Sequence, residues 1–222
     1  MISSQLSAAI IFLLVFCLLI IVAQSLYKFL NLKAEVSRKF MHVSGGAVSL
    51  FFPYFFKVHW WVLLLCCIAF LVLLITYIKK SLPGIHKTNR LSFGSIFFPV
   101  PVYICFLTAN KLDNYLLFFL PISILTISDT IAEWGGKRWG GLSRSFFQGQ
   151  KTLAGSICFA VSCFFIAIIL LTVIFRIPFG KAFFISASLA IIVTAVELIS
   201  MKGYDNLTVP IAALALLILF LE

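Results

Sequence analysis

Charged residues are scarce in this chain of 222 residues, in which Asp, Glu, Lys and Arg together make up only 11%. Hydrophobic residues make up 63%, which lies far outside the composition of a soluble domain. A chain of this length and hydrophobicity can cross a bilayer several times. The composition therefore predicts an all-α, polytopic membrane protein.

Several common site motifs are absent as well. The six cysteines stand inside apolar runs without Cys-x-x-Cys spacing, which favours small buried side chains over zinc ligands or disulfides. The Gly-x-x-x-x-Gly-Lys-Ser/Thr spacing of a Walker motif does not occur. The net charge of +10 comes without a long basic arm, which argues against a nucleic-acid partner.

Eight apolar runs are long enough to cross a bilayer when tilt and polar ends are allowed. They are 6–27, 40–56, 58–78, 93–108, 115–134, 153–175, 182–200 and 207–221. Only Lys57 separates the second run from the third, and the fourth and last runs are short, so seven helices remain an alternative. The length of the first run favours a transmembrane helix over a cleaved signal peptide. We expect one membrane domain over 1–222.

Lys and Arg concentrate on one side of these helices. The connections 28–39, 79–92, 135–152 and 201–206 hold four, four, four and one of the seventeen cations. Because Lys and Arg are retained on the cytoplasmic side, this face is expected to be cytoplasmic and both termini external. All three polar clusters of the chain then lie on the cytoplasmic face.

The first polar cluster runs from 128 to 156 and holds six of the twelve glycines. Its carboxylates, Asp129 and Glu133, are four apart on a helix and share a face at the membrane edge. Two such anions are costly to desolvate without a cation, and Mg²⁺ carrying a nucleotide polyphosphate prefers oxygen ligands of this kind. The alternative is an interfacial ion pair between Glu133 and Lys137, one turn further on.

Glycines of the same cluster suit close approach of the backbone to a phosphate. Gly135, Gly136, Gly140 and Gly141 can adopt positive φ angles, which would let main-chain N–H groups point at phosphate oxygens. Taken singly, each glycine is more simply explained as part of a loop. Their combination with acids and cations favours a phosphate site.

Cations of the cluster could supply the countercharge for that phosphate. They are Lys137, Arg138, Arg144 and Lys151. Lys151 and Thr152 are expected to open the next helix, where the helix dipole favours an anion. We therefore expect Lys137, Arg138 and Lys151 to contact a polyphosphate.

The second cluster lies at the start of the second apolar run. Arg38 and His42 are four apart and share a helix face, and so do Glu35 and Lys39. Arg38 and Lys39 are either membrane anchors or nucleotide ligands. His42 could act as a base, donate to a phosphate or be a hydrogen-bonded buried histidine.

The third cluster contains Glu197, Asp205 and Asn206. Glu197 lies inside an apolar run, where a carboxylate is expensive and marks a functional site by default. Asp205 and Asn206 form the following connection. They could cap the last helix or belong to the site.

Three blocks in this order carry a resemblance to a known family. They are Glu-x-x-Arg-Lys-x-x-His at 35–42, Asp-Thr-x-Ala, Gly-Lys-Arg-x-Gly and Lys-Thr-x-x-Gly-Ser between 129 and 156, and Asp-Asn-Leu-Thr-Val-Pro at 205–210. Together they resemble the CTP-dependent lipid-alcohol kinases, which include dolichol kinase, phytol kinase and the CTP-dependent diacylglycerol kinase. Phosphatidate cytidylyltransferases share a similar middle block, but the flanking blocks fit the kinases. Ser128 and Ala154 depart from the Gly and Glu often found at these places.

The resemblance implies transfer of the γ-phosphoryl group of CTP to the hydroxyl of a polyprenol, phytol or diacylglycerol at the cytoplasmic face. Asp129 and Glu133 would then bind Mg²⁺. The implied nucleotide-binding residues are Arg38, Lys39, Gly135, Gly136, Lys137, Arg138, Gly140, Lys151, Thr152 and Asn206. His42, Asp205 and Glu197 are the candidates for the catalytic base. A cytidylyltransferase that makes CDP-lipid, or a lipid or ion transporter without enzymatic activity, is the alternative.

Overall fold

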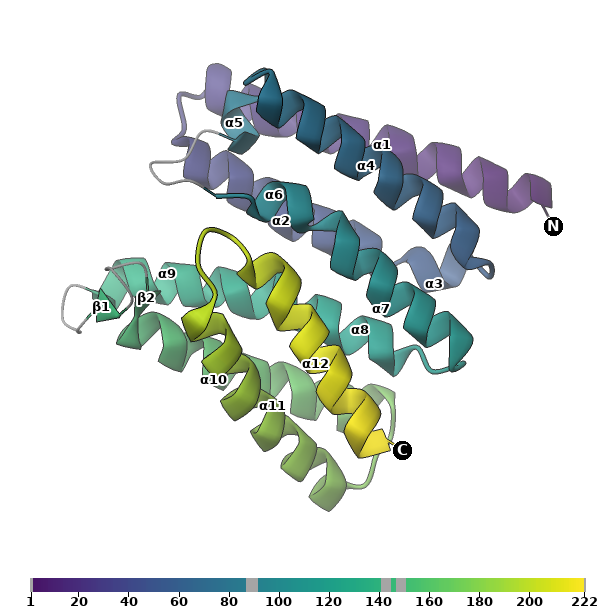
Figure 1. The fold of residues 1–222 in the computed structure, drawn as a ribbon, viewed down its shortest axis with the longest axis vertical. Helices are drawn as coiled ribbons and strands as arrows, with labels where there is room; N and C mark the ends of the chain where they lie inside the picture. Colours follow the sequence, from purple (N-terminus) through teal and green to yellow (C-terminus); the bar gives the residue numbers. More distant parts are fainter. Residues whose placement is uncertain (1, 87–91, 141–144, 147–150, 222) are drawn as a thin grey trace.

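The computed structural model describes residues 2–86, 92–140, 145–146 and 151–221. Gly141 and Arg144 lie outside these ranges. The helices run between two ends of one bundle, and α1 begins and α12 ends at the end away from β1 and β2 (Figure 1). The described parts of the connections rich in Lys and Arg lie at the opposite end.

The first half of the bundle consists of α1 (Ile2–Lys28), α2 (Ala34–Ser49), α3 (Phe52–Phe55), α4 (His59–Ile78), α5 (Pro83–His86), α6 (Gly94–Phe97) and α7 (Pro99–Lys111). The second half consists of α8 (Leu116–Ser123), the π-helical turn η1 (Ile124–Ser128), α9 (Asp129–Trp139), α10 (Leu153–Ile169), a second π-helical turn η3 (Leu170–Ile174), α11 (Phe179–Ile199) and α12 (Asp205–Leu221). Two short antiparallel strands, β1 (Ser145–Phe146) and β2 (Lys151–Thr152), precede α10.

All eight apolar runs are helical, which confirms the all-α membrane fold. Within the described ranges, five continuous helices are long and apolar enough to cross a membrane. They are Ser4–Lys28, His59–Ile78, Leu116–Trp139, Leu153–Ile174 and Phe179–Ile199. α12 is apolar but shorter. The number of crossings and the external termini stay predictions.

The helix formed by α8, η1 and α9 is the centre of the bundle. In the apolar segment of this helix 67% of the residues are buried, against 17% to 44% in the corresponding segments of the other four long helices. Phe118, Leu120 and Ile122 on α8 are fully buried, as expected for a helix that is apolar on every side. The same helix carries Asp129 at the start of α9, so the first polar cluster is anchored to the most buried element.

α2 packs on η1 at Gly46. A Cβ atom added to Gly46 would lie 2.7 Å from Cγ2 of Thr126, closer than real side chains approach. At the adjacent Gly45, the nearest atom to an added Cβ is Cε of Met41 at 4.0 Å. Gly46 therefore allows the two helices to touch, whereas Gly45 borders open space.

Gly46→Ala is expected to lower the free energy of unfolding by about 1–3 kcal/mol, because overpacking displaces α2 or η1. Unfolding of the purified protein in detergent measures this loss, with Gly45→Ala as the matched control. Equal stabilities of the two variants would contradict the close packing at Gly46.

Candidate functional site

A cavity of about 560 Å³ opens among the helices and is lined by residues from all three polar clusters. The predicted site residues in its wall are Arg38, Lys39, His42, Asp129, Glu133, Gly136, Lys137, Lys151, Thr152, Glu197, Asp205 and Asn206. Gly135, Arg138 and Gly140 are outside this wall. Residues up to 168 positions apart in the sequence, from Arg38 to Asn206, thus meet at one place.

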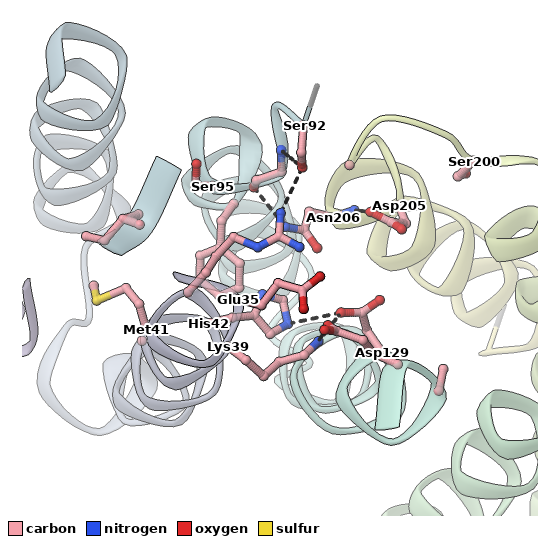
Figure 2. Close-up of a pocket in the computed structure, with 18 of the residues that line it drawn as sticks. Glu35, Lys39, Met41, His42, Ser92, Ser95, Asp129, Ser200, Asp205 and Asn206 are labelled. Carbon is pink, nitrogen blue, oxygen red and sulfur yellow. Dashed lines mark hydrogen bonds and ion pairs between the residues drawn. The ribbon is translucent and has the colours of Figure 1, made fainter. Parts of the chain in front are cut away.

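Lys39 on α2 reaches across to the two carboxylates of α9. Its Nζ lies 3.0 Å from Oδ2 of Asp129 and 2.7 Å from Oε2 of Glu133. Nε2 of His42 lies 3.7 Å from the same Asp129 oxygen. Figure 2 shows these α2 side chains directed at Asp129. A lysine from another helix therefore bridges the carboxylate pair and offsets one of its two negative charges.

At the outer end of the α2–α9 contact a lysine again lies between two carboxylates, but here α9 supplies the lysine. Nζ of Lys137 donates to Oε2 of Glu35 at 3.0 Å and to Oε1 of Glu133 at 2.5 Å. The ion pair between Glu133 and Lys137 that the sequence offered as an alternative is thus present. More than half of the Lys137 side chain is exposed, so this outer pair contributes little stability.

His42 is hydrogen-bonded to η1. Its Nε2 lies 3.1 Å from the carbonyl oxygen of Leu125. Because a carbonyl only accepts, Nε2 carries the proton in this contact, which leaves Nδ1 as the basic nitrogen of the neutral ring. π-helical turns are frequent at functional sites, and η1 ends directly before Asp129.

Lys151 holds the other pair of carboxylates. Its Nζ donates to Oε1 of Glu197 on α11 and, at 2.9 Å, to Oδ2 of Asp205 on α12. Burial alone would lower the pKa of Lys151, but the carboxylates of Asp205, Glu197 and Asp129 outweigh it and raise the pKa above its ordinary value. Oε2 of Glu197 is buried without a hydrogen-bond partner. Lys151 therefore stays charged between the two carboxylates.

Asp205 and Asn206 lie in the first turn of α12, where Oδ1 of Asp205 accepts from the backbone N–H of Asn206 at 3.0 Å while Oδ2 faces Lys151. The Asn206 amide Nδ2 donates to the carbonyl of Gly94 at 2.8 Å. On the other side of α6, Nη1 of Arg38 donates to Oγ of Ser92 at 2.9 Å. These two bonds hold the start of α6 between α2 and α12.

Sequence reasoning missed several cavity residues around this point. They are Ser92, Ser95, Ser200, Lys202 and Gly203. Gly203 has a φ of +84°, and its turn approaches the backbone of Gly94. A glycine in a short polar connection is a signal for such a turn, whereas single serines beside apolar runs give no comparable signal.

The predicted positive φ angles of Gly135, Gly136 and Gly140 are wrong. The first two lie inside α9, and Gly140 at its end is right-handed with a φ of −63°. Instead, an added Cβ at Gly136 or Gly140 would come within 3.0 Å of the Thr152 side chain, and one at Gly135 would overlap Cys158. These glycines let α9 and α10 approach closely, as small residues do between membrane helices.

The structure places Thr152 at the predicted start of a helix and Arg138 outside the cavity. The Thr152 hydroxyl accepts from the backbone N–H of Gly155 at 3.1 Å and caps α10, which confirms the predicted helix start. Arg138 is exposed in the last turn of α9 and is not part of the cavity wall.

The donor set fits magnesium only together with a nucleotide. Over the described part of the chain, no group of three or more His, Cys, Asp or Glu side chains is placed to hold a metal ion. Asp129 and Glu133 offer two carboxylates, and Mg²⁺ is commonly bound by one or two carboxylates together with substrate phosphates. Since Lys39 bridges both acids, metal binding there requires Lys39 to change partners.

The comparisons with known proteins agree with the motifs. No family model and no solved structure matches the chain. Over 183 residues the chain is 26% identical to a protein of Synechocystis sp. named phytol kinase, and the match covers 81% of this chain and 77% of that protein. This match supports the resemblance to the lipid-alcohol kinases at the level of the family.

Proposed function

We propose that the protein transfers the γ-phosphoryl group of CTP to the hydroxyl of a lipid alcohol, with Mg²⁺, at the cytoplasmic face. The observation that carries this proposal is the cavity itself, which joins a charged end to an apolar wall between membrane-crossing helices. A lipid alcohol has the same division into a polar head and an apolar tail. The name of the Synechocystis relative, phytol kinase, supports an acceptor of this class.

In this reaction the oxygen of the alcohol forms a bond to the γ-phosphorus. The bond between that phosphorus and the oxygen bridging it to the β-phosphate breaks, and CDP leaves with the electron pair. The proton of the hydroxyl passes to a base. Phosphoryl transfer needs mainly positioning and neutralisation of charge, for which a cavity lined with lysines and carboxylates is suited.

Two of the lysines that line the cavity, Lys39 and Lys151, would bind the triphosphate. Lys39 and Lys151 each contact two carboxylates, so a phosphate chain offers them anionic partners in exchange. Mg²⁺ bound at Asp129 and Glu133 would neutralise charge on the phosphate oxygens. Glu197 lines the cavity and would face the same ligand.

His42 is our candidate for the base. Lys151 is hydrogen-bonded to both Glu197 and Asp205 and so occupies one acceptor oxygen of each carboxylate. His42 lines the cavity, and its Nε2 contact to Leu125 leaves Nδ1 free to accept. Asp129 lies close enough to orient and stabilise a charged imidazole ring.

The test is a transfer assay with purified protein, a lipid alcohol and CTP labelled at the α or the γ position. We expect the label to enter the lipid from γ-labelled CTP only, with CDP as the second product, and more efficiently from CTP than from ATP. Label entering the lipid from the α position, with release of pyrophosphate, would instead establish a cytidylyltransferase. Binding of the lipid without transfer of label from either position of CTP would favour the transporter alternative.

A further inference from the structure

The cavity has an apolar arm that the reaction chemistry does not account for. Beyond His42 its wall is formed by side chains of α1, α3, α4 and α7, among them Phe16, Phe52, Leu65, Cys66, Ala69 and Val102. On α2 the lining runs from His42 through Gly45 to Ser49, and beyond the end of α2 it continues to Phe52. The arm is thus continuous with the charged end and points along the helices.

Gly45 opens this arm on the side of α2. It is buried in the bundle and lines the cavity, yet an added Cβ would meet only the tip of Met41, at 4.0 Å. A buried glycine normally permits close packing, as Gly46 does against Thr126. At Gly45 the missing side chain leaves space in the arm.

Aromatic rings close the far end of the arm. Phe52 is 1% exposed and packs edge-on against Phe12, with ring centroids 5.1 Å apart. The ring centroids of Phe56 and Phe16 lie 5.6 Å and 6.3 Å from that of Phe52. Phe12 and Phe56 are themselves buried, so the rings of Phe16 and Phe52 that face the arm are backed by a packed layer.

We propose that the arm receives one hydrocarbon tail of the acceptor alcohol and that Phe16 and Phe52 limit the length of that tail. The inference rests on the proposed function and specifies its substrate class. When the hydroxyl of the alcohol lies near His42 and Asp129, the attached tail enters the arm, because the arm is the apolar part of the same cavity. A single closed arm favours a one-tailed alcohol of limited length over a long polyprenol or a two-tailed diacylglycerol.

Competition between alcohols of different tail length tests the proposal. The mixture contains linear alcohols of one and four prenyl units, a long polyprenol and a diacylglycerol, and the phosphorylated products are separated. We expect the wild-type protein to prefer the four-unit alcohol over the long polyprenol and the diacylglycerol by about 10-fold or more, since apolar pockets discriminate by such factors. Equal transfer to the long polyprenol would overturn the length limit.

Gly45→Leu is expected to fill the arm. It should lower the ratio of four-unit to one-unit product by about 10-fold or more. The control is Gly180→Leu, because an added Cβ at Gly180 on α11 has nothing within 4 Å and Gly180 lies outside the cavity wall. An unchanged ratio in a folded Gly45→Leu protein would contradict the placement of the tail.

Shortening the rings at the closed end should act in the opposite direction. Phe16→Leu and Phe52→Leu are expected to raise the share of long-polyprenol product by several-fold, because each removes part of the barrier without emptying the packed layer. Phe165→Leu, at an exposed position of α10, is the control. A length preference unchanged in both variants would show that these rings do not limit the tail.

A crosslinking experiment that does not depend on catalysis tests the tail site separately from the proposed reaction. A four-unit alcohol with a photoreactive diazirine at the tail end should crosslink to peptides containing Phe16 or Phe52, and Gly45→Leu should abolish these crosslinks. If no alcohol is phosphorylated but the crosslinks form, the reaction is wrong and the tail site stands. If phosphorylation occurs without crosslinks at either ring, the tail site is wrong.

Discussion

Asp129→Asn is expected to lower the rate of phosphoryl transfer by about 100-fold or more, the size of effect that loss of one electrostatic group produces in other enzymes. The amide keeps the shape of the side chain but loses the charge that faces Lys39 at 3.0 Å and His42 at 3.7 Å. It also removes one of the two proposed metal ligands. Initial rates with γ-labelled CTP and a lipid alcohol measure the loss.

The matched control is Asp113→Asn. Asp113 is exposed in the connection between α7 and α8, away from the cavity wall. This variant should keep the wild-type rate, which excludes a general effect of removing one negative charge. A folded Asp129→Asn protein with a rate within about twofold of wild type would refute the assignment of Asp129 to the reaction, since a catalytic electrostatic contact contributes far more.

Lys151→Met is expected to destabilise the protein by about 3–5 kcal/mol, the usual cost of leaving buried charges without their partner. The side chain of Lys151 is 17% exposed and that of Glu197 only 4%. Without the lysine, Glu197 and Asp205 would face each other across the cavity. Because the pKa of Lys151 is raised, the stabilisation is fully present below the ordinary pKa of lysine and is lost only at more alkaline pH.

A double-mutant cycle measures the interaction directly. Glu197→Gln combined with Lys151→Met should recover part of the stability lost in Lys151→Met alone, because it removes one of the unpaired charges. Lys181→Met, at an exposed position in the first turn of α11, is the control for loss of a lysine. Strictly additive effects of the two substitutions would show that Lys151 and Glu197 do not interact.

The sequence predicted the helices and the clustering of polar residues, and it offered the Glu133–Lys137 pair within one helix, but not which residues pair between helices. Apolar runs and the numbers of Lys and Arg in each connection are properties of local composition, so a single sequence is enough to identify them. The contact of Lys39 with Asp129 joins α2 to α9, 90 positions further along the chain, and no local pattern specifies the packing of those helices. Sequence reasoning could therefore propose a charged site but not the two lysine-centred groups in it.

Glycine was the least predictable residue type for the same reason. The run around Gly136 and Gly140 was interpreted as a phosphate-binding loop because glycine permits unusual backbone angles. In the structure the useful property is the missing side chain, which lets α9 approach Thr152. Gly45 shows a third use, since its missing side chain leaves part of the cavity open. Only the neighbouring atoms distinguish these cases.

The π-helical turn η1 also determines the direction in which the side chains of α9 point relative to those of α8. A π-helical turn accommodates one residue more than an α-helical turn, and one residue corresponds to a rotation of about 100° in an α-helix. Residues before η1, such as Leu120, face the buried core, while Asp129 after it faces Lys39. Deleting a single residue from η1 would turn α9 relative to α8 and direct Asp129 away from the cavity without changing any side chain of the site.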